Sequence, residues 1–532
     1  MDQYAWPVPV EEQPGSGTAR PPGVDSLPVK KNPYTRLDVL VMLLLAALAF
    51  GAGVWIALNV TQRLPHLEDE MAYIFQARVF ARGSLSAPPP PDTRAFFMPF
   101  VLVVNGNWVG KYPVGWPLVL GIGEALGAGW LVNPILAGLT AAAVYALGRD
   151  VFDRQVGVLA GVLAAASPFF LILAGTYMSH TAGGLWAALL LWAWRRVEMA
   201  REHGESSRGW AALGGAAFGM LALTRPLTAV AIGTPFAVVL AVRLARRPTA
   251  WRDLLRTYWL LAAVALALVL LQPLWLWLTT GSPTTNLYTM VWAYDRIGFG
   301  PDIGRFGHTP AEGFSTAWRD LKLWSSDLFG WHELSWIPVT LGLGLGLLGH
   351  PPGRRGWVLL LAGVFVSLVL FHVAYWIGAS LYGPRYYYEA HAAVAVLAGA
   401  GVRETVRLVS NGRSWLAYPL LAGLLGITLG LYLPARLPDW RDVYGITPEP
   451  LEALREAAGE ENVLIIVEGG RWIQYAPFFA QNSPWLDGDI VAAHAVGPTV
   501  NRTIVEMYPD RSVWYYSDGQ LNPVLLPRRS GD

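Results

Sequence analysis

Long apolar segments recur along this chain, and the first of them covers residues 39–60. An apolar run of about 20 residues is long enough to cross a bilayer as a helix. This run is too long, and begins too far into the chain, for the apolar core of a signal peptide, so we expect it to remain in the protein. The chain is 54% hydrophobic and 14% charged, whereas about a quarter of the residues in soluble domains are charged. The sequence therefore predicts an all-α polytopic membrane protein.

We expect about eleven membrane-spanning helices, several of them shorter than usual. They lie near residues 39–60, 130–148, 156–174, 180–195, 210–224, 227–242, 257–278, 336–349, 357–376, 387–402 and 415–433. Residues 113–126 are also apolar. A span there would reverse the side of every later loop, so we expect instead a helix lying at the outer surface.

Positive residues divide the loops between these spans into two classes. Lys30, Lys31 and Arg36 precede the first span, and arginines gather after alternate later runs. Those arginines are Arg149 and Arg154; Arg195, Arg196, Arg201 and Arg208; Arg243, Arg246, Arg247, Arg252 and Arg256; Arg354 and Arg355; Arg403, Arg407 and Arg413. Because positive loops stay in the cytoplasm, we place the N-terminus there and the acidic stretch after the first span outside, with the protein in the plasma (inner) membrane.

Composition also predicts three regions. Residues 1–36 are rich in Pro, Gly and small polar residues, which indicates a disordered cytoplasmic tail. Residues 37–436 form the transmembrane domain, with long external loops at 61–129 and 279–335, and loops of such length are usually functional. Residues 437–532 are expected to form a small extracytoplasmic α/β domain, with a helix at 451–458 and strands at 462–467 and 512–516.

The stretch HLEDEMAY at residues 66–73 places Glu68, Asp69 and Glu70 a few residues past the first span. Adjacent carboxylates close to lipid need water, cations or a metal. They mark either the edge of an active site, or a solvated loop or helix N-terminus, where acidic residues favour the helix dipole.

Four short motifs give the chain a resemblance to a known family. They are Asp69 and Glu70 after the first span, KYPVGWP at residues 111–117, LTRP at 223–226 and GPRY at 383–386. In this order, and on the predicted outer side, the motifs resemble those of the glycosyltransferase-C superfamily. The likeness is greatest to the branch of protein O-mannosyltransferases and lipid A aminoarabinose transferases, and it covers about residues 36–433. The resemblance implies a glycosyltransferase-C-like bundle.

The resemblance also implies that a sugar moves from a polyprenyl-phosphate carrier to an acceptor hydroxyl on a protein, lipid or glycan outside the membrane. Such an attack needs a positioned base, and the departing phosphate needs cations. Asp69 matches the family's first acidic position and takes the role of base, while Glu70 would orient the acceptor or support a metal. Lys111, Arg225 and Arg385 are the candidate phosphate ligands. Arg225 and Arg385 could instead reach toward lipid headgroups.

Two tyrosines of these motifs and one histidine at a span end are further candidates. Tyr112 and Tyr386 are placed in the substrate site, although rows of aromatic residues are also typical of membrane interfaces. His180 lies at the outer end of a span and could bind substrate, join Asp69 or Glu70 at a divalent metal ion, or be a structural histidine. No cofactor is certain, and a divalent metal ion stays possible.

Other classes of protein find less support. The chain has no cysteine and a net charge of +1, so it offers no disulfide or thiolate metal site and gives no charge argument for nucleic acid. It lacks the nucleotide-binding GxxxxGK[ST] and the metalloprotease HExxH. A transporter, or a non-catalytic binding protein for polyprenyl-phosphate lipids, is the alternative. It would use the same basic residues for phosphate and the acids as an ion site, but no inverted repeat is evident.

Overall fold

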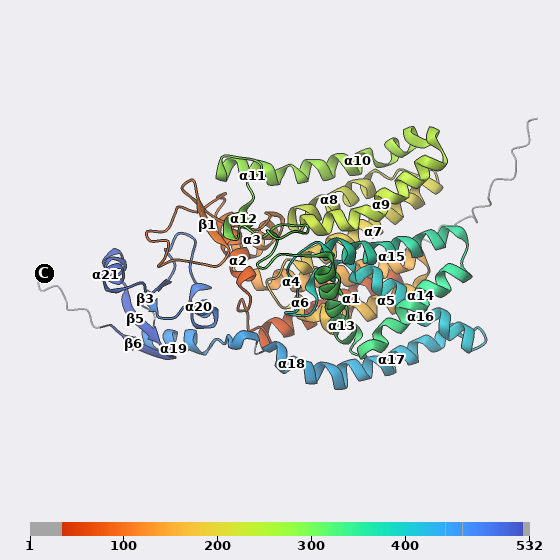
Figure 1. Ribbon diagram of the computed structural model, residues 1–532. Helices are drawn as coiled ribbons and strands as arrows, with labels where there is room; N and C mark the ends of the chain where they lie inside the picture. The colour runs from red at the N-terminus through yellow and green to blue at the C-terminus, as the bar shows by residue number, and fades with distance from the viewer. Residues whose placement is uncertain (1–33, 442, 460, 525–532) are drawn as a thin grey trace, which may run out of the picture.

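The computed structural model describes residues 34–441, 443–459 and 461–524. Most of them are helical, and the molecule is elongated, with a helical bundle at one end and a smaller α/β unit at the other (Figure 1). The tail expected at residues 1–36 lies outside the described residues up to residue 33, and helix α1 begins at Arg36.

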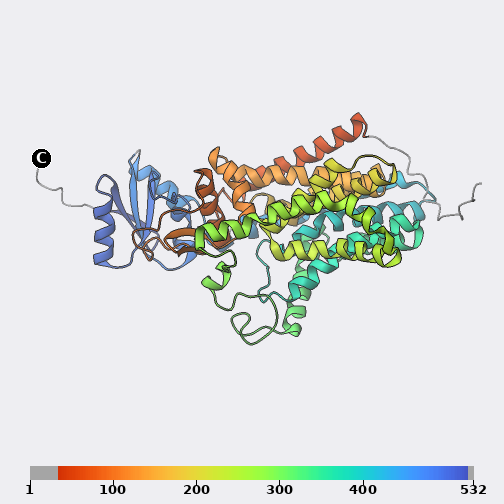
Figure 2. The ribbon, with the colours of Figure 1, turned by 90° about the horizontal axis from the view of Figure 1, so that it is seen from above.

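The bundle consists of helices that run along the long axis of the molecule (Figures 1 and 2). Its helices are α1 (Arg36–Asn59), α4 (Val132–Val151), α5 (Arg154–Ala165), α6 (Pro168–Ala174), α7 (His180–Glu202), α8 (Arg208–Thr224), α9 (Pro226–Arg246), α10 (Trp251–Val269), α11 (Leu271–Thr280), α14 (Trp336–Gly349), α15 (Pro352–Val373), α16 (His391–Val409), α17 (Ala417–Ile427) and α18 (Leu433–Arg441). Helix α4 packs between α1, α5 and α7, and α8 packs between α7 and α10.

Every predicted span falls on helix, but the run at 156–174 is not one straight helix. Ser167 caps the start of α6 and Pro168 occupies its first position, so α5 ends before them. Proline disfavours helix in the residue before it, and α5 and α6 meet at a bend of 59°.

Six of the described helices are long and apolar enough to cross a membrane, or seven if α5 and α6 together make one span. The chain is therefore a multi-pass membrane protein, while the number of eleven crossings remains a prediction.

A buried charge cluster fixes the start of α1. Asp38 and Thr35 form a reciprocal cap, in which the backbone N–H of Thr35 donates to Asp38 Oδ2 at 2.7 Å. The other oxygen of Asp38 accepts bonds from Tyr145 Oη at 2.6 Å, Arg149 Nε at 3.0 Å and Arg154 Nε at 2.9 Å. These bonds tie α1 to α4 and to the first residue of α5.

Two long segments are inserted between helices of the bundle. The first, residues 61–129, contains α2 (Glu68–Ala81), the antiparallel strands β1 (Val101–Val104) and β2 (Asn107–Gly110), and α3 (Gly115–Ala125). The helix expected at 113–126 is α3, which packs on α2. The second, residues 279–335, contains α12 (Leu287–Val291) and α13 (Pro310–Phe329), and its irregular part projects sideways (Figure 2).

Residues 443–459 and 461–524 form what we call the C-terminal unit. Its elements are α19 (Glu449–Ala458), β3 (Val463–Val467), α20 (Trp472–Phe479), β4 (Ile490–His494), α21 (Pro498–Met507), β5 (Ser512–Ser517) and β6 (Gln520–Pro523). The strand order is β4-β3-β5-β6, with β3 parallel to β4 and β5 and with β6 antiparallel to β5. All five residues of β3 are buried, as expected for a central parallel strand. The predicted helix at 451–458 and strands at 462–467 and 512–516 are confirmed as α19, β3 and β5.

The C-terminal unit is bonded to the first inserted segment. Arg78 Nη1 on α2 donates to the carbonyl oxygens of Ala480 at 2.7 Å and Asn482 at 3.0 Å. Trp472 Nε1 donates to the carbonyl of His66 at 2.9 Å, immediately before the acidic stretch. The position of the acidic stretch therefore depends on contacts with residues about 400 positions later in the chain.

Candidate active site

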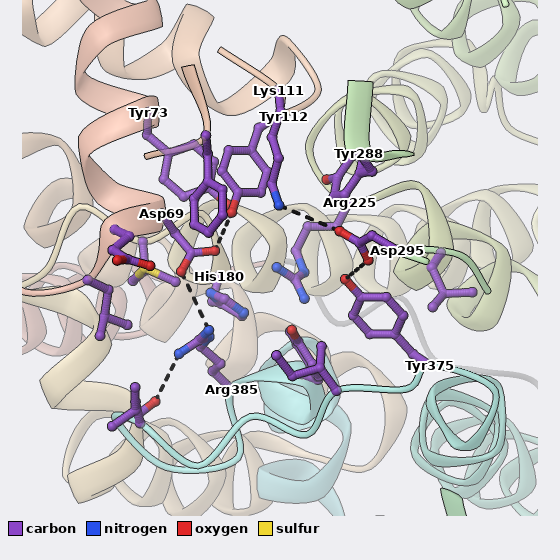
Figure 3. Close-up of a pocket in the computed structure, with 18 of the residues that line it drawn as sticks. Asp69, Tyr73, Lys111, Tyr112, His180, Arg225, Tyr288, Asp295, Tyr375 and Arg385 are labelled. Atoms are coloured by element: carbon purple, nitrogen blue, oxygen red, sulfur yellow. Dashed lines mark hydrogen bonds and ion pairs between the residues drawn. The ribbon is translucent and has the colours of Figure 1, made fainter. Parts of the chain in front are cut away.

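A cavity of about 750 Å³ lies where the bundle, both inserted segments and the C-terminal unit meet. Its walls come from the ends of bundle helices near residues 178–180, 224–228 and 372–386, from residues 67–73, 100–112 and 286–297, and from residues 444 and 471–473. The residues Asp69, Lys111, Tyr112, His180, Arg225, Arg385 and Tyr386, proposed from sequence, all line it. Figure 3 shows six of them pointing toward a common space.

Asp69 lies in the first turn of α2, at the edge of the cavity. The hydroxyl of Tyr112 donates a short hydrogen bond to Asp69 Oδ1. Arg385 Nη2 lies 3.7 Å from Oδ2, too far for a strong hydrogen bond. The side chain of Asp69 keeps 25% of its surface exposed. Asp69 therefore has one oxygen fixed by a tyrosine and one loosely paired oxygen beside the cavity (Figure 3).

Glu70, the second acidic candidate, is completely buried and does not line the cavity. Its Oε2 accepts the backbone N–H groups of His66 at 2.7 Å and Leu67 at 2.9 Å, and its Oε1 accepts that of Tyr177 at 2.8 Å. Asp69 lines the cavity, whereas both oxygens of Glu70 point to backbone amides. Glu70 secures the start of α2, which is the helix-terminus interpretation of the acidic stretch, while Asp69 faces the site.

Glu68, the third acid of the stretch, also lines the cavity. Burial, and next the negative charge of Asp69, raise the pKa of its carboxyl above the usual range.

Lys111 follows β2 and its side chain is buried, with its Nζ 3.6 Å from Asp295 Oδ2. Four aromatic rings surround the ammonium: Phe100, Tyr288, Trp292 and Tyr112, with centroids at 3.9, 4.9, 4.9 and 5.1 Å from Nζ. Burial lowers the pKa of Lys111, and the charge of Asp295 opposes that shift. Ring faces attract a cation, so the cage holds the ammonium in the cavity wall.

Arg225 caps the start of α9, immediately after α8 ends. Its Nε lies 2.8 Å from Oε1 of the fully buried Glu389, which belongs to the short 3-10 helix Arg385–Ala390. A Cβ atom at Gly183 on α7 would lie only 2.6 Å from that same Oε1. A glycine is therefore required for Glu389 to approach α7 and reach Arg225.

His180 is the first residue of α7 and is 1% exposed. Neither of its ring nitrogens has a hydrogen-bond partner in the described chain. Its ring stacks on Tyr386 with the centroids 6.3 Å apart, and Tyr386 stacks in turn on His372 at 5.4 Å. His180 thus offers unused polar atoms between Arg225 and Arg385 (Figure 3).

The residues considered as metal ligands do not form a ligand group. Three backbone amides occupy both oxygens of Glu70, and Tyr112 occupies one oxygen of Asp69. Within the described ranges, no three His, Cys, Asp or Glu side chains are grouped so that they could hold a metal ion. These residues do not fit a resident metal ion, and the mechanism below uses none.

Sequence reasoning assigned no role to several residues of the site. Asp295 accepts Trp376 Nε1 at 3.1 Å and Tyr375 Oη at 3.3 Å, besides facing Lys111. The position of Asp295 in a long loop dense in aromatic residues could have indicated a role in the site. Glu389 lies only four residues after Arg385, and no local pattern connects it with Arg225.

Comparison with known proteins agrees with this architecture. The sequence profile of the family described as dolichyl-phosphate-mannose-protein mannosyltransferase matches residues 118–277. No curated protein matches the chain. Among solved structures, ArnT from Cupriavidus metallidurans in the apo state is 15% identical, with a TM-score of 0.55 over 90% of this chain and 91% of that chain. ArnT from the same organism bound to undecaprenyl phosphate is also 15% identical, with a TM-score of 0.55 over 91% of each chain.

The chain thus has the fold of the glycosyltransferase-C membrane enzymes. The resemblance inferred from four short motifs is confirmed, including its direction toward ArnT and the protein mannosyltransferases.

Proposed function

We propose that this protein is a membrane glycosyltransferase that moves a sugar from a polyprenyl-phosphate carrier to an acceptor hydroxyl. The observation that carries the proposal is the cavity itself, because it brings Asp69 together with Lys111, Arg225 and Arg385. A carboxylate and a cluster of cations are what an acceptor hydroxyl and a departing phosphate need. The shared fold with an ArnT structure that holds undecaprenyl phosphate supports the choice of carrier.

In the proposed reaction, Asp69 accepts the proton of the acceptor hydroxyl through its loosely paired Oδ2. The acceptor oxygen bonds to the anomeric carbon of the sugar as the bond from that carbon to the phosphate oxygen breaks. The phosphate leaves with the bonding electrons and remains on the lipid. The Tyr112 hydroxyl fixes the other oxygen of Asp69, so the carboxylate keeps one orientation during the proton transfer.

The cations stabilise the charge that develops on the leaving phosphate. Arg385 lies 3.7 Å from Asp69, so it can bind phosphate while it remains close to the base. Arginine presents a planar set of donors that suits a phosphate. Glu70 is a positioning residue, because it holds the first turn of α2. His180 offers a ring nitrogen to the substrate.

The proposal includes the predicted topology. The N-terminus is cytoplasmic, about eleven helices cross the plasma membrane, and the cavity and the C-terminal unit face outward. The start of α1 and the C-terminal unit lie at opposite ends of the molecule (Figure 1), which supports this arrangement. Within the bundle, the residues that line the cavity lie at one end. A one-sided pocket of this kind favours an enzyme over a transporter, which needs a path across the bilayer.

The proposal is tested with purified protein in nanodiscs and a panel of radiolabelled polyprenyl-phosphate sugars. Release of label from the carrier should occur with one donor and fall by about 100-fold or more in Asp69→Asn, because general-base catalysis typically contributes about 10²–10⁴-fold. Asp302→Asn, at an exposed position outside the cavity, is the matched control. Equal release by wild type and Asp69→Asn would refute the role of Asp69. Tight carrier binding without release, in membranes that contain acceptor, would support the binding-protein alternative.

A further inference from the structure

Five cationic side chains line the cavity, and they differ in their partners. Lys111, Arg225 and Arg385 each face a carboxylate. Arg296 and Arg471 are exposed, and the guanidinium of neither is bonded to a carboxylate in the part of the chain that the structure describes. Two of the five cations are thus available to a negatively charged ligand.

Arg471 belongs to the C-terminal unit and directly precedes α20. The next residue, Trp472, is 9% exposed, and its indole N–H donates to the carbonyl of His66. This bond anchors the backbone beside Arg471 to the segment that leads into Asp69. Ile473 and Tyr444 continue the same wall, and Tyr444 is 51% exposed.

Arg296 belongs to the second inserted segment and follows Asp295, the partner of Lys111. The backbone after it is also held, because Ile297 forms a β-bridge with Tyr375 and the N–H of Gly298 donates to a carbonyl oxygen at 2.8 Å. The backbone beside both Arg296 and Arg471 is therefore held in place. Arg296 lies in the second inserted segment and Arg471 in the C-terminal unit, and neither of these segments contains one of the three paired cations.

We infer that Arg296 and Arg471 bind an acidic group of the acceptor, so that the acceptor is a hydroxyl compound that also carries a phosphate or a carboxylate. The inference rests on the proposed function. The lipid phosphate of the donor already has three cations that can face it. Two further arginines in the wall of the same cavity add positive charge that attracts an anion. The acidic group is not altered in the reaction; it aligns the acceptor so that its hydroxyl reaches Asp69.

The inference is tested with the full-length protein in membranes that contain its native acceptor, supplied with radiolabelled polyprenyl-phosphate sugar. Arg471→Gln and Arg296→Gln should each lower transfer to the acceptor by about tenfold, the usual effect of one lost hydrogen bond to a charged group. The donor concentration that gives half-maximal rate should not change, and slow release of the sugar to water should persist. Arg471→Lys should retain part of the transfer, because it keeps the charge. Arg502→Gln, at an exposed position on α21 away from the cavity, is the control and should behave as wild type.

The charge of the product gives an independent result. After removal of the carrier, the labelled product should bind to an anion-exchange resin, and loss of that binding after phosphatase treatment identifies a phosphate rather than a carboxylate. An uncharged product, unchanged transfer in both glutamine variants, or an altered donor requirement would each overturn the inference. If label never leaves the carrier in an Asp69-dependent way in wild type, the proposed function itself has failed, which is a distinguishable outcome.

Discussion

Two clusters of buried charge lie near opposite ends of the bundle, and they differ in how completely their charges are paired. The carboxylate of Asp38 is fully buried and accepts hydrogen bonds of 2.6 to 3.0 Å from Tyr145, Arg149 and Arg154. In the cavity, Arg225 is closely paired with Glu389 at 2.8 Å, but the ion pair of Asp69 with Arg385 is 3.7 Å long and that of Lys111 with Asp295 is 3.6 Å long. The first cluster is complete without a ligand and stabilises the fold. The second keeps charges that a substrate can take.

Asp38→Asn should give the largest effect and show most clearly that the first cluster supports stability rather than activity. It removes the buried negative charge that Arg149 and Arg154 both contact, although Arg149 keeps Asp150 at 3.0 Å. Breaking a buried ion pair costs about 3 kcal/mol or more. The free energy of unfolding in detergent should fall by that amount, while release of sugar per folded molecule stays near wild type. Tyr145→Phe removes only one neutral partner and should cost about 1 kcal/mol. Normal stability of Asp38→Asn would mean that the first cluster is not structural.

Lys111→Ala should instead act mainly on the use of the donor. The donor concentration for half-maximal rate should rise about 10- to 100-fold, since a hydrogen bond to a charged group contributes about 1.5–3 kcal/mol. The free energy of unfolding should also fall, but by less than in Asp38→Asn, because the buried Asp295 loses its cation and keeps Tyr375 and Trp376 as donors. Donor titration and thermal unfolding of the same preparation check both statements. A large loss of stability with normal donor use would place Lys111 in the structural class.

The pH dependence of donor use sharpens the same contrast. Burial lowers the pKa of Lys111, so its positive charge is lost at a lower pH than that of a free lysine. Donor affinity should therefore be full below this lowered pKa and decrease as the pH rises through it. Lys111→Arg should remove that decrease, because arginine stays charged. The same alkaline decrease in Lys111→Arg would assign it to another group.

Arg82→Ala should have the smallest effect. Arg82 pairs with Asp487 of the C-terminal unit at 2.7 Å, but the two side chains are 47% and 51% exposed. Exposed ion pairs contribute about 1 kcal/mol or less. Thermal unfolding and sugar transfer should both remain close to wild type. A strong loss of transfer would show that this exposed pair controls how the C-terminal unit closes the cavity.

The sequence predicted those features that follow from local patterns. Apolar runs located the bundle helices. Four motifs located six residues that line one cavity, and the end of a span located a seventh, His180. The direction of Glu70 was not predictable, because it depends on the rotational phase of α2, and three adjacent acids leave that phase undefined. The pairing of Arg225 with Glu389 joins positions 164 residues apart (389 minus 225), and no periodicity in the sequence reports such a contact. The wall formed by Arg471 was missed for the same reason.

The hydrogen bonds between residues 66–78 and residues 472–482 have a consequence for the biosynthesis of the protein. Chains are made from the N-terminus at about 5–20 residues per second, so the helices of the bundle exist well before the last wall of the cavity. A nascent or truncated chain can insert its helices yet still lack the contacts that support the segment before Asp69. The cavity therefore gains its last wall only after residues 472–482 have been synthesised and have packed against residues 66–78.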